Sequence, residues 1–424
     1  MVKVAYGKRM LLCDIPEGRI AGVVGKKLTR PGDVRRRVIR ALSHPIGGQP
    51  LERLARGKRK ILIVFPDSTR KAHLKEVLPL LLKRIDDGSR EIRMMIATGM
   101  HARHTHEECA ALVGRAVARK YNVASHSQEK GTLVHYGKTK SGVPVALNRQ
   151  IEWCDLLITV GVVEPHLYAG YSGGVKTVAI GLAGEETISA THSVSFLDDP
   201  TVRLGLVKGN RFQDALQEIG AHAGIDFAVN MVNSPEGGAA HVLSGAPRAV
   251  FQEAIRLSKG LFEVHVDKAA DIVLCGAGHP KDVNLYQASR ALNYIANVDR
   301  PIVRKGGMII VCAELKDGPG TSAAEKRFYD DVCGMRSPRE FLARVKKDGC
   351  VAGEHRAYMV ARVLADYRVA FVTQKKLPRQ DELPFLVFGT VKGAVDHAFS
   401  ITGNDATCYV VPYVLSTIAQ VVSS

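Results

Sequence analysis

KILIVFPDSTRKAHLKEVLPLLLKRI, residues 60–85, contains a strand, a loop and a helix in succession. The segment 60–65 is apolar and rich in β-branched side chains, which is typical of a strand buried on both faces. After a polar loop, residues 72–85 repeat apolar side chains at helical spacing. A buried strand followed by an amphipathic helix is the unit from which parallel sheets are built. This stretch therefore predicts an α/β fold.

The same alternation extends along the chain and restarts once. Further strands are predicted at 91–98, 154–163 and 225–233, with helices at 104–121 and 247–261. The second series has strands at 270–278, 306–315, 367–373 and 407–414, and helices at 285–299, 322–333, 337–347 and 355–365. Because 424 residues exceed the usual size of one core, we expect two domains, 1–265 and 266–424, with the last residues packing back on the first.

Each predicted domain has a mainly parallel sheet flanked by helices. Ligands bind outside the carboxyl ends of the strands in such sheets. The loops that follow the predicted strands should therefore gather in a cleft between the two domains, and this cleft is where we expect the site.

Composition favours an ordinary enzyme of the cytoplasm. No stretch is apolar enough for a signal peptide or a membrane span, and the eight cysteines form no CxxC pair, which is typical of reduced thiols. Lysine and arginine number 59 against 42 acidic residues, a net charge of +17. The basic stretches 26–42 and 53–62 alternate with apolar residues and lack interleaved aromatic side chains. They indicate solvent-facing helices, and nucleic acid is not expected as a partner.

The loop PDSTRKAH, residues 66–73, follows the first strand and offers an anion site. Backbone N–H groups at the start of a helix, hydroxyl side chains and the guanidinium of Arg70 suit a phosphate or a carboxylate. The same Asp, Ser and Thr residues would also serve simply as helix caps. Both interpretations remain open from these residues alone.

The loop ATGMHARHTHEE, residues 97–108, follows the next strand and contains three histidines. His104 and His106 belong to the start of the following helix, where Thr105 and Glu108 form a capping-box pattern. His101 follows a glycine directly after the strand, the better position for a catalytic imidazole. The alternative is an ordinary surface histidine.

The stretch EPHLYAGYSGGVKTVAIG, residues 164–181, holds a single lysine, Lys176, in a glycine-rich loop. GYSGGVKT almost matches the phosphate-loop pattern but has Val175 where the second glycine should stand. A β-branched residue hinders the curl of backbone amides around phosphate, so an NTPase is the weaker interpretation. A lysine buried among apolar neighbours has a lowered pKa, and its neutral amine can form a covalent bond to a cofactor.

Two further segments contribute candidate side chains. His192, in the loop-like segment SATHSVSF at 189–196, is either a satisfied loop histidine or a single metal ligand, because no HxH, HExxH or CxxC partner lies nearby. In HPKDVNLYQASRALNY, residues 279–294, Gln287 and Arg290 share one face of a predicted helix. They point either into the interdomain cleft or to solvent.

Taken together, these sequence motifs resemble those of the lactate racemase family. The resemblance runs along most of the chain and rests on an ordered set of motifs: DSTR, TGMH, EPHLYAGYSGGVK, the THS histidine, GNRFQDALQEIG with DFAVNMVN, and LYQASRAL. No single motif is specific for the family, but the order and the spacing of the motifs are. The resemblance implies a first domain that binds the cofactor and performs catalysis, and a second domain that completes the substrate site.

The resemblance also implies a cofactor, the nickel-pincer nucleotide. Lys176 would hold it covalently through a thioamide, and His192 would complete a square-planar nickel site whose other ligands belong to the cofactor. Such geometry suits nickel(II). The residues implied in binding cofactor anions are Asp67, Ser68, Thr69 and Arg70.

The implied reaction is racemisation or epimerisation of a 2-hydroxy acid. His101 and His166 would alternate as acid and base while the α-hydrogen leaves as hydride to the cofactor and a planar 2-keto acid is held. The residues implied in orienting the substrate are Arg70, Tyr286, Gln287 and Arg290.

Two departures from the lactate racemases favour a substrate other than lactate. Arg290 stands where those enzymes carry lysine, and the only tryptophan, Trp153, lies outside the later half of the chain. We therefore expect either lactate or a larger or dicarboxylic 2-hydroxy acid. A family relative with a different nucleotide and a phosphate-loop NTPase also remain open. Enzymes of cofactor biosynthesis are expected as maturation partners, and the sequence does not predict the oligomeric state.

Overall fold

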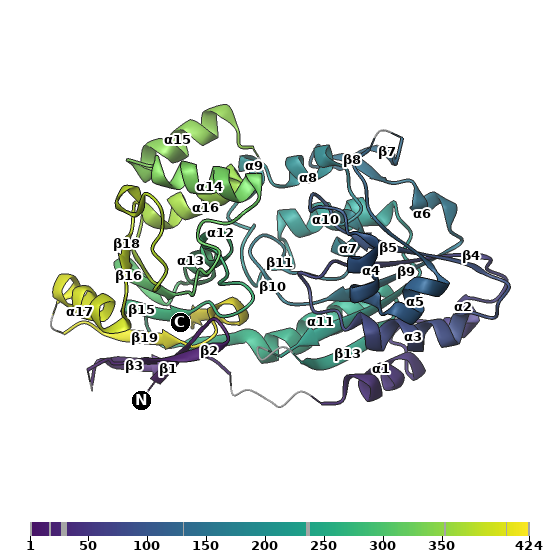
Figure 1. Ribbon diagram of the computed structural model, residues 1–424, viewed down its shortest axis with the longest axis horizontal. Coiled ribbons are helices and arrows are strands. Elements are labelled where there is room, and N and C mark those ends of the chain that lie inside the picture. The colour runs from purple at the N-terminus through teal and green to yellow at the C-terminus, as the bar shows by residue number, and fades with distance from the viewer. Residues whose placement is uncertain are drawn as a thin grey trace.

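The computed structural model describes residues 2–16, 18–26, 32–129, 131–234, 238–351, 353–403 and 405–422. It has two α/β domains side by side, each built on a six-stranded sheet (Figure 1). The predicted α/β fold with two mainly parallel sheets is confirmed.

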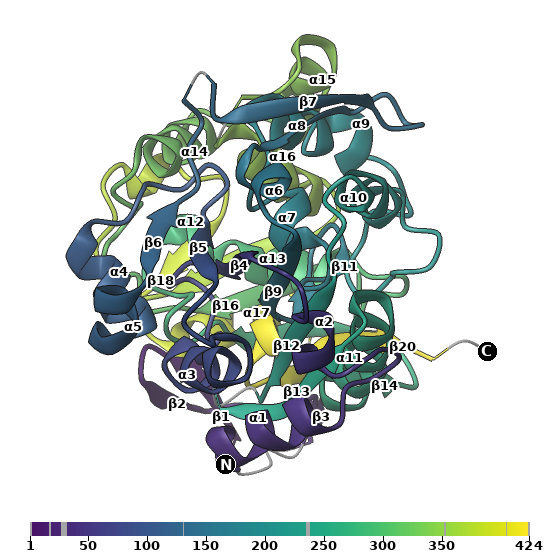
Figure 2. The same cartoon turned by 90° about the vertical axis from the view of Figure 1, so that its right-hand side faces the viewer.

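The first sheet has the strand order β13-β12-β9-β4-β5-β6 (Figure 2). All neighbours are parallel except β12 and β13. The strands are β4 (Lys60–Pro66), β5 (Glu91–Ala97), β6 (Asn122–Ser125), β9 (Leu156–Val162), β12 (Phe227–Asn233) and β13 (Ala239–Gly245).

Alternating side chains of β4 explain how helices cover both faces of this sheet. Ile61 and Ile63 pack with apolar residues of one set of helices: α1 (Val34–Ser43), α3 (Leu74–Ile85), α4 (His106–Val113) and α5 (Arg115–Lys120). Leu62 and Val64 belong to the cluster formed with the opposite set: α7 (Lys176–Ala179), α10 (Arg211–Ala221) and α11 (Pro247–Phe262). A strand buried on both faces is what the apolar run predicts.

The second sheet is entirely parallel, with the order β18-β17-β16-β15-β19-β3. Its strands are β3 (Ile20–Val23), β15 (Ala270–Gly276), β16 (Val303–Cys312), β17 (Arg368–Val372), β18 (Leu386–Phe388) and β19 (Cys408–Val411). The helices on the side facing the first domain are α12 (Leu285–Ala288), α13 (Arg290–Ala296), α14 (Ala323–Cys333), α15 (Pro338–Asp348) and α16 (Glu354–Leu364). The other face packs against α17 (Val391–Thr402) and the hairpin of β1 (Val2–Tyr6) and β2 (Arg9–Cys13).

The remaining elements are short. They are β7 (Leu133–Lys138), β8 (Pro144–Asn148), β10 (Pro165–His166), β11 (Gly170–Tyr171), β14 (Glu263–Val266), β20 (Ile418–Val421), α2 (Leu51–Leu54), α6 (Gln150–Trp153), α8 (Glu185–Thr191), α9 (Val194–Leu197) and the 3-10 turns Gln380–Glu382 and Val414–Ser416.

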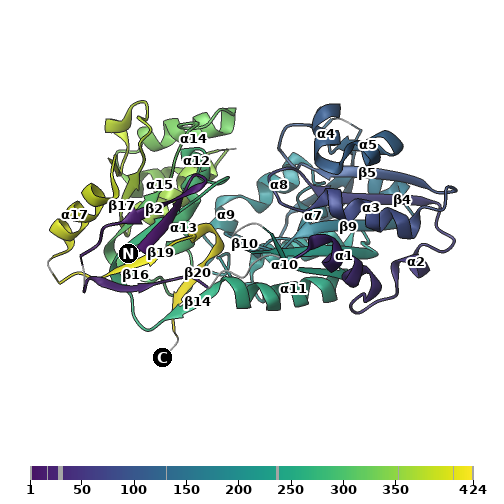
Figure 3. The same cartoon turned by 60° about the horizontal axis from the view of Figure 1, so that its bottom comes forward.

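The chain does not divide at residue 265 as simply as the sequence suggests. β3 joins the second sheet through parallel pairing with β19, although the sequence places residues 1–265 in the first domain. β20 pairs with β14 at the expected boundary, and both β2 and β20 lie on the side of the second domain (Figure 3). The N-terminal strands thus belong spatially with residues almost four hundred positions away.

Two predicted helices are interrupted. The helix expected at 104–121 is divided into α4 and α5 at Gly114, whose φ of 93° no helix can accommodate. The helix expected at 285–299 is divided into α12 and α13, which meet at Ser289. Periodicity alone does not reveal either break, because apolar spacing continues across it.

One apolar cluster joins the two domains. It contains Leu62 and Val64 from the first sheet and Val273 and Val311 from the second. The Tyr294 hydroxyl also donates a hydrogen bond of 2.7 Å from the second domain to the carbonyl oxygen of Pro165 in the first. This shared core fixes the loops of the two domains against each other.

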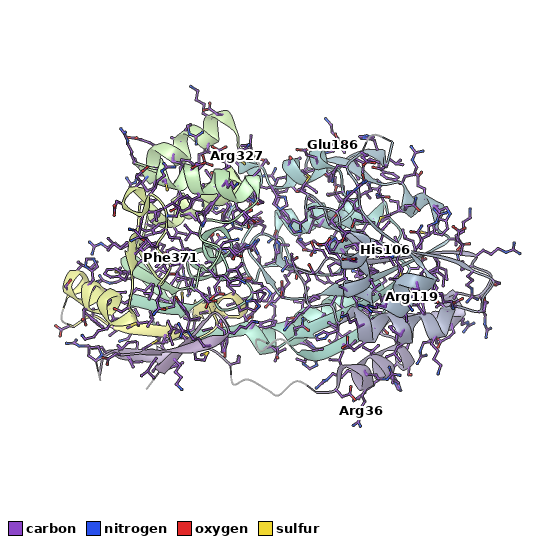
Figure 4. The ribbon with its side chains drawn as sticks, in the orientation of Figure 1. Arg36, His106, Arg119, Glu186, Arg327 and Phe371 are labelled. Carbon is purple, nitrogen blue, oxygen red and sulfur yellow. The ribbon has the colours of Figure 1, made fainter. Side chains whose placement is uncertain are left out.

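Basic side chains of the N-terminal region lie on the protein surface. In α1, Val38, Ala41 and Leu42 are buried while Arg36 is exposed at the outer edge of the molecule (Figure 4), unlike Phe371, which lies inside the second domain. The second basic stretch, 53–62, is not a helix but covers the end of α2 and the start of β4. Of the helices in the described part of the chain, none has the length and apolar character needed to cross a membrane. All eight cysteines are free thiols.

Candidate active site

Asp67 and His101 form a hydrogen-bonded pair where β4 and β5 end. Asp67 is 5% exposed, and its Oδ2 lies 2.6 Å from Nδ1 of His101. Burial would raise the pKa of the Asp67 carboxyl, but the hydrogen bonds from His101 and Thr69 lower it to about 2. Because the carboxylate is ionised, it accepts this hydrogen bond and Nδ1 of His101 donates it. The side chain of His101 is 64% exposed, so its Nε2 can be reached by a ligand.

Arg70, four residues after the end of β4, is paired with a carboxylate in the loop that follows β9. Its Nη1 donates to Oε1 of Glu164, and Nζ of Lys281 lies 3.6 Å from the same oxygen. Burial, followed by the charges of Arg70 and Arg290, lowers the pKa of Lys281 to about 7. Glu164 thus links cations from both domains.

A tight hairpin, β10 and β11, presents His166 next to this ion pair. Nδ1 of His166 accepts hydrogen bonds from the backbone N–H groups of Tyr168 at 3.3 Å and Ala169 at 3.2 Å. Burial, with the charges of Lys176 and Arg70, holds the pKa of His166 well below its ordinary value. The ring is therefore neutral, with its proton on Nε2.

Gly170 makes this hairpin possible. Its φ is +73°, and a Cβ at this position would lie 1.9 Å from the carbonyl oxygen of Leu206. The carbonyl oxygen of Leu206 cannot move far enough to relieve this clash unless the hairpin moves too.

We expect Gly170→Ala to destabilise the protein by more than about 3 kcal/mol, since it adds a backbone clash to the strain of a positive φ. Gly209→Ala is the matched control: Gly209 has a φ of +75°, and nothing lies within 4 Å of the place that a methyl group would take, so only about 1 kcal/mol should be lost. Urea unfolding of both variants measures the difference. Equal losses would show that the contact with Leu206 is unimportant.

Lys176 follows two glycines in the left-handed region, Gly173 and Gly174, and opens the single turn α7. Burial is the main cause that lowers the pKa of Lys176 to about 7, and the charges of Arg70 and Arg290 act in the same direction. The neutral amine is therefore available near neutral pH and can act as a nucleophile. A phosphate loop would instead open a long helix and would have a glycine in place of Val175.

His192 lies at the end of a helix, not in a loop as the sequence suggests. It is the C-cap of α8, where its Nδ1 donates to the carbonyl oxygen of Ile188 at 2.8 Å. Burial lowers the pKa of His192 to about 4, so the ring is neutral and Nε2 has a free lone pair. This tautomer leaves Nε2 able to act as a metal ligand.

Aromatic rings surround His192 on several sides. The centroids of the Tyr168 and Phe212 rings lie 5.6 Å and 5.2 Å from that of His192, and His355 from α16 lies at 6.1 Å. Within the described ranges, no group of three or more His, Cys, Asp or Glu side chains could hold a metal ion. If His192 binds a metal ion, the remaining ligands would have to come from a bound group.

Arg290 contributes a side chain of the second domain to the site that contains His166 and Lys176. Its pKa is lowered to about 10 by burial and by the charge of Arg356, and its own charge acts on His166 and Lys176. Tyr286 packs edge-on against Phe328 at 5.3 Å. Gln287 is half-buried, and its backbone N–H donates to Oδ1 of Asn284 at 2.9 Å.

A pocket of about 390 Å³ adjoins the Asp67–Arg70 loop. Ser68 and Thr69 are exposed; Ser68 lines this pocket, while Thr69 donates to Asp67. The other polar residues that line it are Arg70, Lys71, His73, Lys75, Glu76, His104 and Glu108. Its basic lining at the start of α3 suits an anionic group such as a phosphate.

The structure adds functional residues that the sequence does not single out. Glu164 and Lys281 lie in segments with recognisable motifs, but nothing local marks Glu164 as the carboxylate that Arg70 and Lys281 share. His355 and Arg356 stand at the start of α16, which has no motif. A polar pair at the first turn of a helix in the second domain is the only signal, and it is a weak one.

The fold and these side chains define a class: a two-domain α/β enzyme in which imidazoles, amines and guanidinium groups from both domains meet at the domain junction. Comparison with known families agrees with this. The model of the lactate racemase N-terminal domain matches residues 6–205, and that of the lactate racemase C-terminal domain matches residues 265–419. The chain belongs to the lactate racemase family and is an isomerase of the racemase type.

Individual relatives cover the whole chain. The lactate racemases of Thermoanaerobacterium thermosaccharolyticum and Lactiplantibacillus plantarum are each 28% identical to it, over 99% of both chains. The structure of the lactate racemase apoprotein from T. thermosaccharolyticum superposes with a TM-score of 0.90, over 99% of both chains. A Thermotoga maritima protein of 18% identity shares the fold, with a TM-score of 0.66 over 94% of this chain and 100% of its own.

Proposed function

We propose that this protein is a 2-hydroxyacid racemase or epimerase that holds a nickel-pincer nucleotide on Lys176. One observation carries the proposal. Lys176, whose pKa is lowered to about 7 mainly by burial, lies within electrostatic reach of Arg70 and Arg290, and its own charge acts on His166 and His192. A nucleophile, imidazoles and anion-binding groups are the parts that such a reaction needs.

The residues present fit this cofactor. Lys176 would form the covalent link, and Nε2 of His192 would be the protein ligand to nickel, since Nδ1 is already committed to Ile188. The basic pocket beside Ser68 and Arg70 would accept the nucleotide's anionic part. When bound, the cofactor supplies a reversible acceptor for the hydride that leaves the α-carbon of the substrate.

The protein's own side chains bind the substrate and move its hydroxyl proton. Arg290, with Gln287 beside it, would bind the α-carboxylate, and Arg70 would orient the substrate. His101 would accept the hydroxyl proton at Nε2, because the Asp67 carboxylate at Nδ1 stabilises the resulting imidazolium. His166 would present Nε2 from the other side, and the two imidazoles would exchange roles for the opposite enantiomer.

We expect His192→Ala to lose nickel, because it removes the proposed ligand nitrogen and the described part of the chain holds no group of three or more His, Cys, Asp or Glu side chains that could bind the ion instead. Protein should be prepared in a host that makes the cofactor, and nickel per chain measured by elemental analysis. His355→Ala is the matched control, since it removes a half-buried imidazole 6.1 Å away and should leave the metal content unchanged. Nickel at wild-type stoichiometry in His192→Ala would contradict the ligand assignment.

Maturation partners belong to the same proposal. The cofactor must be made and loaded by biosynthetic enzymes of the host, so protein from a host without them should be inactive. Loading such protein with the purified cofactor should restore racemisation.

A further inference from the structure

Two buried polar groups beside His192 have no partner within the described part of the protein. Tyr168 is 4% exposed and Arg356 is 3% exposed. The hydroxyl of Tyr168 and Nε of Arg356 have no hydrogen-bond partner there, although Nη1 of Arg356 donates to Oδ1 of Asn293 at 3.2 Å. A buried donor without an acceptor destabilises the protein, and more so if it is charged. A bound ligand that supplies the acceptor would remove this cost.

The two groups lie at the same corner of the site and come from different domains. The Tyr168 ring packs edge-on against His192, and Cζ of Arg356 lies 6.0 Å from the centroid of the Tyr286 ring. The charge of Arg356 acts on both Tyr168 and His192. Both groups therefore border the place where the reaction is proposed to occur.

The charge at this corner is not balanced by protein carboxylates. Asp67 is bound to His101, and Glu164 is shared by Arg70 and Lys281. Glu354, two residues before Arg356, is paired with Arg344 at 2.7 Å. Neither Arg290 nor Arg356 forms an ion pair with any residue that the structure describes. Two guanidinium groups thus remain for two anionic groups of a ligand.

We infer that Arg356 and Tyr168 form a second anion subsite, and that the substrate is a 2-hydroxydicarboxylic acid. Its α-carboxylate would bind Arg290, and its second carboxylate would accept hydrogen bonds from Nε of Arg356 and from the hydroxyl of Tyr168. Hydrogen bonds to an ionised carboxylate are about twice as strong as neutral ones, which gives the subsite its selectivity. This inference rests on the proposed function, and it names the substrate class.

Binding to the full-length protein, with and without cofactor, tests the subsite independently of turnover. The probes are malate and 2-hydroxybutyrate, which have the same chain length and differ in the second carboxylate. Titration calorimetry should show malate binding at least about tenfold tighter in the wild type. Tyr168→Phe, which keeps the ring packing, and Arg356→Gln should both remove this preference. Arg368→Gln, which changes an exposed guanidinium on β17, should retain it.

Turnover by the cofactor-loaded enzyme tests the substrate class. The ratio of kcat/KM for malate to that for 2-hydroxybutyrate, from chiral analysis of the products, should exceed about 100 in the wild type and fall at least tenfold in Arg356→Gln. An unchanged ratio would overturn the inference. If the mass on Lys176 is also lost in that variant, the anion at this corner belongs to the cofactor, and the inference again falls.

The two proposals fail differently. If loaded enzyme racemises 2-hydroxybutyrate as well as malate, the racemase stands and the second subsite falls. If it racemises no 2-hydroxy acid while malate binding still depends on Tyr168 and Arg356, the subsite stands and the racemase proposal falls.

Discussion

Lys176→Arg should abolish both the covalent cofactor and the activity. A guanidinium retains the positive charge but cannot form the thioamide, so the intact mass of the variant should equal that of the bare chain. Since the cofactor supplies the hydride acceptor, turnover should fall by at least about 10⁴-fold. Mass spectrometry of protein from a cofactor-producing host, with a racemisation assay, measures both effects.

Lys281→Arg is the control that makes this experiment decisive. Lys281 is a second lysine of the same cluster whose pKa is lowered to about 7. A lowered pKa alone would make it an equal candidate for the covalent link. We expect Lys281→Arg to retain the added mass, since Lys281 is tied to Glu164 and lies on the loop before α12. Loss of the mass in Lys281→Arg and its retention in Lys176→Arg would place the link on Lys281 and refute our proposal.

His101→Ala and His166→Ala should each leave nickel and the mass on Lys176 in place while reducing kcat by about 10²- to 10⁴-fold, the range of a general acid or base. The physical reason differs between the two. Removal of His101 leaves the ionised Asp67 without its imidazole, and removal of His166 leaves the backbone N–H groups of Tyr168 and Ala169 without their acceptor.

A histidine of the same loop provides the control. His106, five residues beyond His101, is exposed at the first position of α4 and is not among the residues that line the basic pocket, so His106→Ala should retain most of the activity. Exchange of the substrate α-hydrogen should be followed as well, because it reports on the first half of the reaction. Full activity in either His101→Ala or His166→Ala would exclude a mechanism with two bases.

The parts of the site that follow parallel strands could be predicted from the sequence. Apolar runs such as 60–65 and 91–98 identify strands, and in a parallel sheet the loops after them meet at one edge. That rule places Asp67 and His101 near each other, and their side chains are hydrogen-bonded. The role of each residue, in contrast, follows from the family resemblance.

The parts that depend on packing between distant segments could not be predicted. Lys281 contacts Glu164 of the first domain, and the charge of Arg356 acts on Tyr168 and His192, only because the domains share a core. Periodicity contains no information about such proximity. The N-terminal strands escape prediction for a related reason. β2 and β3 are short and only partly buried, so their apolar pattern is weak, and β3 becomes a strand through its pairing with β19.

The pairing of β3 with β19 has a consequence for biosynthesis. The edge strand β3 of the second sheet is translated before every other strand of that sheet, including its neighbour β19. All strands of the first sheet lie between β3 and β15 in the sequence, so that sheet can form before the second sheet is complete. β3 can take its place only when β19 is available, and the order of translation therefore differs from the order of assembly.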